Sequence, residues 1–303
     1  KIHKYLYNNG FFENQVHFRT DSTKRRIRVR YQIEENKPTV LRNTYFTSKN
    51  YALDSILDQE KSNTLLLPKK RYDGDTFENE RVRIETTLRN KGYYGFSRQN
   101  VSYLVNDTLT HATTDSLFKK VDVIVKVDIP QKLQPFKPYK IGSVFFEVLS
   151  TSNLPDSLFK KDTVEYQGIK YIFSEKRYSP RILNSKLQVR PDARYNQSLE
   201  RETQQQLSLT DQFRFVNAPL DSANHTLNVH YKALPLEKYQ ISADVGVNVI
   251  QLQGDPGPFA NLSYKIRNVF NGLENFESNI RGGIELVPGF VGSRKINRSQ
   301  ELN

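Results

Sequence analysis

Few residue combinations in this chain could perform acid–base, nucleophilic or metal chemistry. Of the five histidines, only His225 and His230 are close in sequence, and strand residues five positions apart point to opposite faces. Ser179 and Ser198 lie near predicted helix starts, where capping explains them better than nucleophilic attack. The 303 residues contain no cysteine, which excludes a thiolate zinc site and a cysteine nucleophile. We therefore predict no enzyme activity, no metal and no cofactor.

Phosphate and nucleic-acid binding are not indicated either. The segment Gly254-Asp255-Pro256-Gly257-Pro258 is rich in glycine, but it lies between two predicted strands with no lysine and no following helix, which is typical of a hairpin loop. The net charge of +12 is spread along the chain among acidic residues, with no basic helix or recognition motif. We expect no nucleic-acid partner, and a cationic surface near lipid headgroups explains the charge better.

The chemistry that the sequence favours is hydrogen bonding by the backbone of strands. Residues 238–286 contain three runs in which apolar and polar residues alternate, and a membrane β-strand needs roughly 9–11 such residues. Residues 238–290 are therefore predicted to hold three strands with one apolar face, and residues 291–303 a loop or the start of another strand. Tyr239, Phe259, Tyr264 and Phe276 are expected to face lipid or the aromatic girdle.

One α+β unit recurs before these strands. Residues 37–130 are predicted to fold in the order strand, helix, helix, strand, strand. Residues 135–235 repeat this order with an insertion at about residues 153–178, and residues 1–36 match only the last part of the unit. The strongest predicted helix begins with a capping box of Asp75 and Glu78. A helix ending near Leu209 is expected to bury Leu199 and Leu207.

The step from the second helix to the next strand carries the most telling residues. In the complete copy it reads Leu88-Arg89-Asn90-Lys91-Gly92-Tyr93-Tyr94, in the first copy Asn8-Asn9-Gly10-Phe11-Phe12, and in the third, without glycine, Leu209-Thr210-Asp211-Gln212-Phe213. Asn268-Val269-Phe270-Asn271-Gly272-Leu273-Glu274 follows between two of the later strands. In this order the chain resembles the Omp85 superfamily of outer-membrane assembly factors, most closely its TamA-like and BamA-like branch.

This resemblance implies a fold of α+β POTRA (polypeptide-transport-associated) repeats followed by the first strands of a transmembrane antiparallel β-barrel. Members of the superfamily close a barrel of sixteen strands, so we expect the chain to be a fragment. The resemblance places the barrel in the outer membrane of a Gram-negative cell and the repeats in the periplasm. The implied partners are unfolded outer-membrane or surface proteins, accessory assembly subunits and the lipid bilayer.

The resemblance also implies where an unfolded client would pair. The exposed edge of a POTRA sheet is typically the strand after the second helix, which gives the candidates Gln99, Val101, Tyr103, Val105, Phe213 and Phe215. The first barrel strand would form one side of a weak seam, which gives the candidates Tyr239, Ile241, Ala243, Val245, Gly246, Val247 and Val249. Gly246 is expected to weaken side-chain packing in that strand. The aromatic residues near Gly10 and Gly92 are predicted to pack in cores.

Three functions stay open on the sequence. The first is an assembly factor whose repeats receive unfolded substrates and whose barrel seam templates their insertion. The second is a two-partner-secretion pore that exports one dedicated passenger, and the third is a periplasmic scaffold without a barrel. Depletion separates the first two, because broad loss of barrel or surface proteins favours the assembly factor and loss of one secreted product favours the pore.

Overall fold

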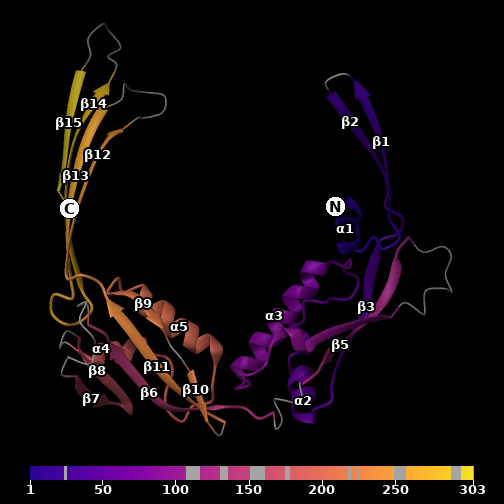
Figure 1. The fold of residues 1–303 in the computed structure, drawn as a ribbon, viewed down its shortest axis with the longest axis horizontal. Coiled ribbons are helices and arrows are strands. Elements are labelled where there is room, and N and C mark those ends of the chain that lie inside the picture. The colour runs from indigo at the N-terminus through magenta and orange to yellow at the C-terminus, as the bar shows by residue number, and fades with distance from the viewer. Residues whose placement is uncertain are drawn as a thin grey trace. The chain divides into compact units, whose positions relative to one another are not determined.

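The computed structural model describes residues 1–23, 26–106, 117–129, 136–150, 161–174, 178–217, 220–223, 225–248, 257–287 and 295–302. The chain divides into two compact units (Figure 1), of which the first comprises Lys1–Tyr139 with Arg194–Gln197 and the second Lys140–Ala193 with Ser198–Asn303. The mixed α+β class predicted from the sequence is confirmed, because the strands form several small sheets with helices between them. Val249, Gly254-Asp255-Pro256 and much of the insertion lie outside the described residues.

The first unit begins with helix α1, Ile2–Asn8, and an antiparallel hairpin of β1, Gln15–Thr23, and β2, Arg26–Glu34. The register sets Phe18 opposite Tyr31, so the apolar residues of both strands share one face. Phe18, Tyr31 and Ile27 are exposed on that face. The hairpin therefore presents an apolar side that the described residues leave uncovered.

The rest of the first unit has the predicted order of strand, two helices and two strands. Its elements are β3, Thr39–Ser48; α2, Tyr51–Gln59; the 3₁₀ turn η1, Lys61–Asn63; α3, Gly74–Asn90; the 3₁₀ turn η2, Arg98–Asn100; β4, Val101–Asn106; and β5, Lys119–Val127. The sheet order is β3-β5-β4, with β3 parallel and β4 antiparallel to the central β5. Leu53, Ile84 and Phe96 are fully buried between the helices and the sheet.

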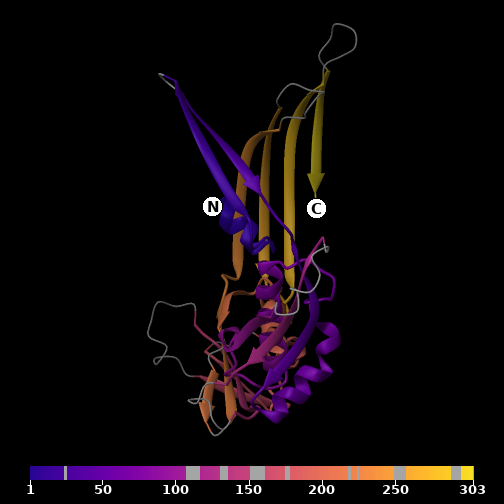
Figure 2. The ribbon, with the colours of Figure 1, turned by 90° about the vertical axis from the view of Figure 1, so that its right-hand side faces the viewer.

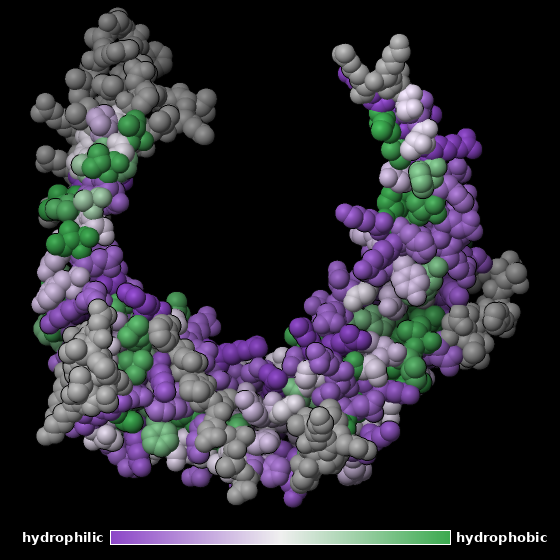
Figure 3. Space-filling view, viewed as in Figure 1, coloured by the Kyte–Doolittle hydropathy of each residue, from purple (hydrophilic) through white to green (hydrophobic). Residues whose placement is uncertain are grey.

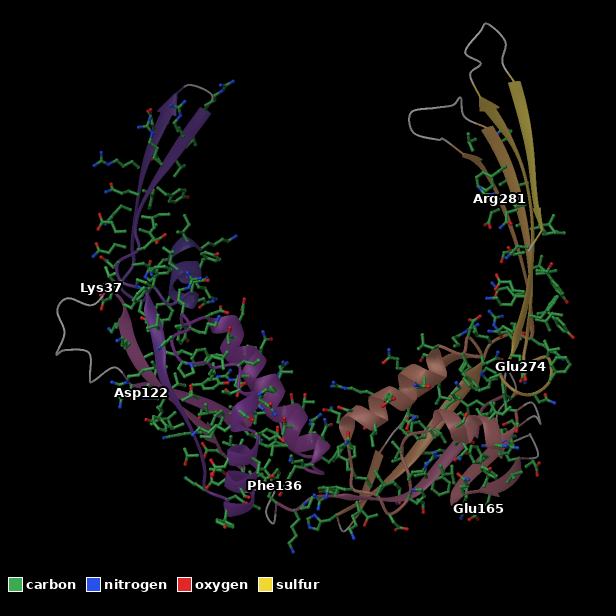
Figure 4. All side chains as sticks on the ribbon, turned by 180° about the vertical axis from the view of Figure 1, so that it is seen from behind. Lys37, Asp122, Phe136, Glu165, Glu274 and Arg281 are labelled. Carbon is green, nitrogen blue, oxygen red and sulfur yellow. The ribbon has the colours of Figure 1, made fainter. Side chains whose placement is uncertain are left out.

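A polar contact joins the two parallel strands of this sheet. Arg42 of β3 donates from Nε to Oδ1 of Asp122 on β5 over 2.8 Å, and its Nη2 bonds the second carboxylate oxygen (Figure 4). These hydrogen bonds from Arg42 lower the pKa of Asp122. A planar guanidinium matches a carboxylate in two places, so this pair fixes direction as well as distance.

The N-cap of helix α3 lies two residues before the predicted one. The carboxylate of Asp73 accepts the N–H groups of Asp75 and Thr76 at 3.2 Å each, which makes Asp73 the N-cap and places Asp75 inside the first turn. The capping box was wrong because both aspartates precede the same apolar face, and Glu78 instead pairs with Arg81 at 3.3 Å.

Glu80, in the same helix, is 0% exposed although no sequence pattern predicted its burial. Its carboxylate pairs with Arg83 at 2.8 Å and accepts from Thr64 Oγ1 at 2.9 Å and from the N–H of Leu65 at 3.0 Å. A buried carboxylate needs such partners because its desolvation is costly. Glu80 thereby holds the segment after η1 against α3.

The second unit repeats this arrangement with two additions, the hairpin β7–β8 and the short strand β10. Its elements are β6, Lys140–Val148; β7, Asp162–Tyr166; β8, Ile169–Phe173; α4, Pro180–Lys186; α5, Gln197–Ser208; β9, Phe213–Asn217; β10, Leu220–Ala223; and β11, Thr226–Pro235. β6 is parallel to β11, and β9 and β10 pair antiparallel with the other side of β11. The described part of the insertion is the hairpin β7–β8, whose β8 adds parallel to β6.

Two expectations for the helices of this unit need correction. Leu207 is buried as predicted, but Leu199 is 37% exposed, and α5 buries Thr203, whose Oγ1 accepts the N–H of Gln188 at 2.9 Å. Ser179 occupies the N-cap position of α4, but its side chain makes no capping hydrogen bond. The position was predicted correctly, and the bond was not.

The second unit also contains a four-stranded antiparallel sheet. Its strands are β12, Tyr239–Asn248; β13, Gly257–Arg267; β14, Asn275–Val287; and β15, Lys295–Leu302, and they lie side by side in chain order (Figures 1 and 2). The pairing register aligns Ala243, Leu262 and Ile280 across three strands, so the apolar residues form one continuous face. The last segment, predicted as a loop or strand, is a strand.

The apolar face of this sheet is the more exposed of its two faces. Ile241 is 71% and Val245 85% exposed, whereas the polar residues Asn261 and Ser263 on the opposite face of β13 are half-buried. Figure 3 shows hydrophobic residues at the surface of the sheet. A sheet in water buries its apolar face and hydrates its polar one. The polarity of this sheet is therefore inverted with respect to a water-soluble one.

Across the ranges given above, no helix is long and apolar enough to cross a membrane. In the same residues, no group of three or more histidine, aspartate or glutamate side chains is placed to hold a metal ion.

The cap of α3 gives a direct test of the fold. Asp73→Ala should destabilise the chain by about 1 kcal/mol, because it removes the acceptor of two N–H groups at the helix start. Asp75→Ala is the matched control and should cost only a few tenths of that. Thr76 and these N–H groups lower the pKa of Asp73, so the cap stabilises above the ordinary aspartate pKa and is lost as pH falls through the lowered value. Urea unfolding followed by circular dichroism at pH 7 and pH 3 measures both effects; an equal loss in the two variants would contradict the assignment.

Candidate strand-pairing edges

The edge of the three-stranded sheet formed by β4 carries outward-pointing backbone groups. The N–H of Asp128 donates to the carbonyl of Asn100 over 2.9 Å, which sets the phase of the antiparallel ladder between β4 and β5. Because hydrogen-bonded and non-hydrogen-bonded pairs alternate in such a ladder, the N–H and C=O groups of Val101, Tyr103 and Val105 point away from β5. No strand among the described residues pairs with this side of β4. The geometry allows one further strand there.

Two of these three predicted residues, Val101 and Tyr103, anchor the edge to the core through their side chains. Val101 is buried, and the hydroxyl of Tyr103 donates to the carbonyl of Phe77 at 2.7 Å, with the two rings 4.8 Å apart. Burial raises the pKa of Tyr103, so its hydroxyl stays protonated as a donor at physiological pH. Val105 is exposed. A strand added to β4 would therefore pair with an edge that is held in place, because Val101 lies in the core and Tyr103 is bonded to helix α3.

Gln99 was expected on this edge strand, and that prediction is wrong. It lies in the 3₁₀ turn η2, where its N–H donates to Ser97 Oγ at 3.4 Å. A serine capping the turn competes with strand formation over these residues, so the strand begins at Val101.

The opposite edge of the same sheet is closed by the chain itself. The N–H of Leu41 on β3 donates to Lys70 O at 2.8 Å, Lys69 N–H donates back to Leu41 O at 2.7 Å, and Tyr72 N–H donates to Thr39 O at 2.8 Å. In the second unit, β8 pairs with the corresponding side of β6, and β7 follows as the outermost strand. The first strand of each α+β sheet is therefore covered on its outer side.

In the second unit the strand after the second helix is β9, as predicted. β9 pairs with β11 on one side, and its other side has no partner strand among the described residues. Phe213 is buried, with its ring 5.2 Å from that of Tyr178 and 6.1 Å from that of Phe146. Phe215 lies on β9 opposite Leu234; its side chain lies outside the description. Phe213 thus anchors the start of this edge to the core.

The outer edge of β12 has the same backbone geometry as β4 over a longer stretch. The N–H of Arg267 donates to Lys238 O at 2.8 Å, so the alternate residues of β12 from Gln240 onward bond β13. Within the described ranges β12 has no partner on its other side. The residues whose N–H and C=O groups point outward are Tyr239, Ile241, Ala243, Val245 and Val247.

These five residues are also the ones whose side chains form the apolar face of β12. Of the predicted seam residues, Gly246 belongs to the other set, because its N–H and C=O groups point toward β13, opposite Phe259. Val249 lies outside the described residues. One strand edge thus combines unpaired backbone groups with apolar side chains.

The expectations for Phe259 and Gly246 need correction, because both residues lie on the polar face of the sheet. Phe259 was expected to face lipid, but its register opposite Gly246 places it on the polar face, where the Arg281 guanidinium carbon lies 4.8 Å from its ring centroid (Figure 4). A Cβ on Gly246 would lie 2.8 Å from the Cε1 atom of that ring. Gly246 therefore makes room for Phe259 and does not merely weaken packing.

Buried polar residues at the base of this sheet were not predicted from the sequence. Arg267 is 6% exposed and Gln212 1%, and both make hydrogen bonds between the sheet and the end of α5. One signal for this contact exists in the sequence, because Asp211 stands where the other two copies have Gly10 and Gly92.

No family model and no curated protein matches the chain. Among solved structures, it is similar to POTRA3-5 of BamA from Haemophilus influenzae, at 16% identity over 77% of this chain and 76% of that one, with a TM-score of 0.43. BamA from Haemophilus ducreyi lacking POTRA domains 1-3 gives 11% identity, coverage of 82% and 43%, and a TM-score of 0.42. CdiB from Acinetobacter baumannii gives 12% identity, coverage of 83% of this chain and 39% of that one, and a TM-score of 0.33. The chain thus spans under half of the latter two proteins.

Gly246→Ala tests the packing beneath β12. It should destabilise the sheet by about 1 to 3 kcal/mol, because the added methyl group overlaps the Phe259 ring, which Arg281 covers. Gly282→Ala is the matched control, since a Cβ there meets nothing within 4 Å. The loss of folded protein with temperature, measured for the full-length protein in detergent, compares the two variants. Equal midpoints would show that Phe259 does not occupy the space above Gly246.

Proposed function

We propose that the chain is part of an outer-membrane protein assembly factor of a Gram-negative cell. In this proposal the sheet β12–β15 lies in the outer membrane as part of a β-barrel, and the α+β units lie in the periplasm. Unfolded outer-membrane or surface proteins pair with the open strand edges, and accessory assembly subunits are further partners. The observation that carries the proposal is the outer edge of β12, where outward backbone groups and apolar side chains belong to the same five residues.

The apolar face of the sheet supports the membrane setting. In water, exposed side chains such as Ile241, Val245 and Ile280 would cost free energy in proportion to their apolar area, about 25 cal/mol per Å². In a bilayer the same face meets hydrocarbon, and the polar face with Asp244, Asn261 and Arg281 meets a wet interior. The inverted polarity of the sheet is then its stable arrangement.

The membrane setting gives the edge of β12 its function. An unpaired backbone N–H or C=O group in hydrocarbon costs several kcal/mol, so this edge requires a partner strand. A client strand that alternates apolar and polar residues can satisfy both requirements at once, because it pairs with the backbone and continues the apolar face. We propose that β12 templates such strands during insertion.

The edges of β4 and β9 would act before insertion. In the aqueous periplasm their outward groups are hydrated, and a hydrogen bond formed with a client replaces one with water, for a net gain of only about 1 kcal/mol. Pairing there is therefore weak and reversible, which suits the reception and release of unfolded chains. The function requires no covalent chemistry, and we propose that the protein is not an enzyme and uses no cofactor.

Photo-crosslinking in cells tests the pairing directly. A photoreactive phenylalanine at Val245, on the outer edge of β12, should form adducts with newly made outer-membrane proteins when it is placed in the full-length protein. Leu262 is the matched control position, since it is exposed on the same apolar face but lies one strand inward, paired with both neighbours. We expect adducts at residue 245 and few at residue 262. Equal yields at the two positions, or none at residue 245 in cells that are making these proteins, would contradict the proposal.

A further inference from the structure

The residue after the second helix of each α+β copy has a left-handed backbone conformation. Gly10 has φ of +84°, Gly92 of +96° and Asp211 of +53°. Each lies four residues after a buried leucine, and each donates its N–H to the carbonyl three residues earlier. These leucines are Leu6, Leu88 and Leu207, and the accepting carbonyls are those of Tyr7, Arg89 and Ser208. The three positions are therefore structurally equivalent, although the third carries no glycine.

The carbonyl at this position accepts a hydrogen bond from the next part of the chain in every copy. Gly10 O accepts the N–H of Thr39, which begins β3, at 2.9 Å. Gly92 O accepts the N–H of Tyr139 at 2.8 Å, immediately before β6. In the third copy, Asp211 O accepts from Arg267 Nε at 2.8 Å, a side chain at the end of β13. Arg267 thus takes the place that a strand N–H has in the other copies.

Aspartate at this position adds a second contact that glycine cannot make. A left-handed backbone disfavours residues with a side chain, although aspartate tolerates it better than most. The carboxylate oxygen Oδ2 of Asp211 lies 3.3 Å from Arg267 Nη2 and 3.1 Å from Lys265 Nζ. The unfavourable conformation is thereby offset by two charged partners on β13.

The guanidinium of Arg267 donates hydrogen bonds to acceptors in three segments. Besides Asp211, its Nη1 donates to Glu237 O at 3.1 Å and its Nη2 to Gln240 Oε1 at 2.6 Å. Glu237 lies between β11 and β12, and Gln240 is the second residue of β12. A planar group with fixed donor directions that is 6% exposed holds its acceptors in a defined geometry. Arg267 therefore ties the end of α5, the connection after β11 and the start of β12 together.

A second group of hydrogen bonds reinforces this contact on the neighbouring strand. Gln212 Nε2 donates to Asn275 Oδ1 at 2.6 Å, and Asn275 Nδ2 donates to Thr210 O at 3.1 Å. The N–H of Ser179, at the start of α4, donates to Asn271 O at 2.8 Å in the turn before β14. The α+β fold of the second unit is thus bonded to both β13 and β14.

We infer that Asp211 and Arg267 are positioning residues of a joint that fixes the start of β9 relative to the start of β12. β9 begins two residues after Asp211, and Arg267 holds Gln240 in β12. The joint therefore fixes the distance and orientation between the open edges of β9 and β12. This inference does not depend on the function proposed above. A transfer of client strands from β9 to β12 along this joint does rest on the function proposed above.

Distance measurements by pulsed electron spin resonance test the joint in the full-length protein in lipid. The 303 residues contain no cysteine, so nitroxide labels can be attached to cysteines introduced at Gln205, exposed on α5, and at Val245 on β12. The unsubstituted joint should give a single narrow distance peak. Arg267→Gln should lose that peak, and Arg267→Lys, which keeps the charge but not the planar donors, should recover part of it.

Asp211→Gly distinguishes a loss of rigidity at the joint from a loss of thermal stability. Glycine keeps the backbone carbonyl and relieves the left-handed conformation, so the thermal midpoint should not fall, yet the narrow peak should broaden because the carboxylate is lost. In the double variant with Arg267→Gln the broadening should be less than the sum of the two single effects, since both changes remove the contact between Asp211 and Arg267, although Asp211→Gly also removes the contact with Lys265. Arg281→Gln, the same substitution on β14 away from the joint, is the control and should keep the peak.

A narrow peak in both Arg267→Gln and Asp211→Gly would overturn the joint, as would equal broadening in Arg281→Gln. These outcomes are independent of client binding. A rigid joint without client adducts at residue 245 would contradict the proposed function and support the joint. Client adducts without a rigid joint would support the proposed function and contradict the joint.

Discussion

Backbone hydrogen bonding at the edges of sheets is the constraint on which this structure depends. A strand at the end of a sheet leaves half of its N–H and C=O groups without a strand partner, and folded proteins rarely leave such groups unsatisfied. The chain closes the edge of β3 with residues 69–72 and the edge of β6 with the inserted strand β8. In the described residues it leaves one side of β4, β9 and β12 without a partner strand, as it does for the terminal strands β7, β10 and β15. The pattern repeats in both α+β sheets, so the open side is a property of the fold and not an accident of one loop.

The surroundings of each edge decide what an open edge does. In the proposed function, water satisfies the outward groups of β4 and β9, so a pairing strand would gain little and could leave. The groups of β12 belong to residues whose side chains form an exposed apolar face, and in hydrocarbon they have no such substitute. The same geometry thus gives reversible pairing in one solvent and strong pairing in the other. The contacts of Arg267 bond the α+β fold of the second unit to the four-stranded sheet, and in that proposal they connect the aqueous part to the membrane part.

The alternation of apolar and polar residues predicted most of this fold, because a strand repeats every two residues and its apolar face follows from that period alone. The order of strands and helices was likewise predicted for the first unit, whereas the strands β7, β8 and β10 of the second unit were not. Register and tertiary contacts were not. Phe259 has an apolar side chain, and only its pairing opposite Gly246 shows that it lies on the polar face. Gln99 was predicted on the edge strand, but Ser97 caps a 3₁₀ turn that contains it. The contact of Asp211 with Arg267 spans 56 positions, and its single trace in the sequence is an aspartate in the place of a glycine.

Amide hydrogen exchange along β12 tests the central claim most directly. The measurement uses nuclear magnetic resonance on the full-length protein in lipid nanodiscs, with and without an unfolded outer-membrane protein. The N–H groups of Gln240 and Ser242 bond β13 and should be protected in both samples, whereas those of Ile241 and Val245 should gain strong protection only when the client is present. Equal protection of both sets without the client, or no gain for Ile241 and Val245 with the client bound, would contradict the account.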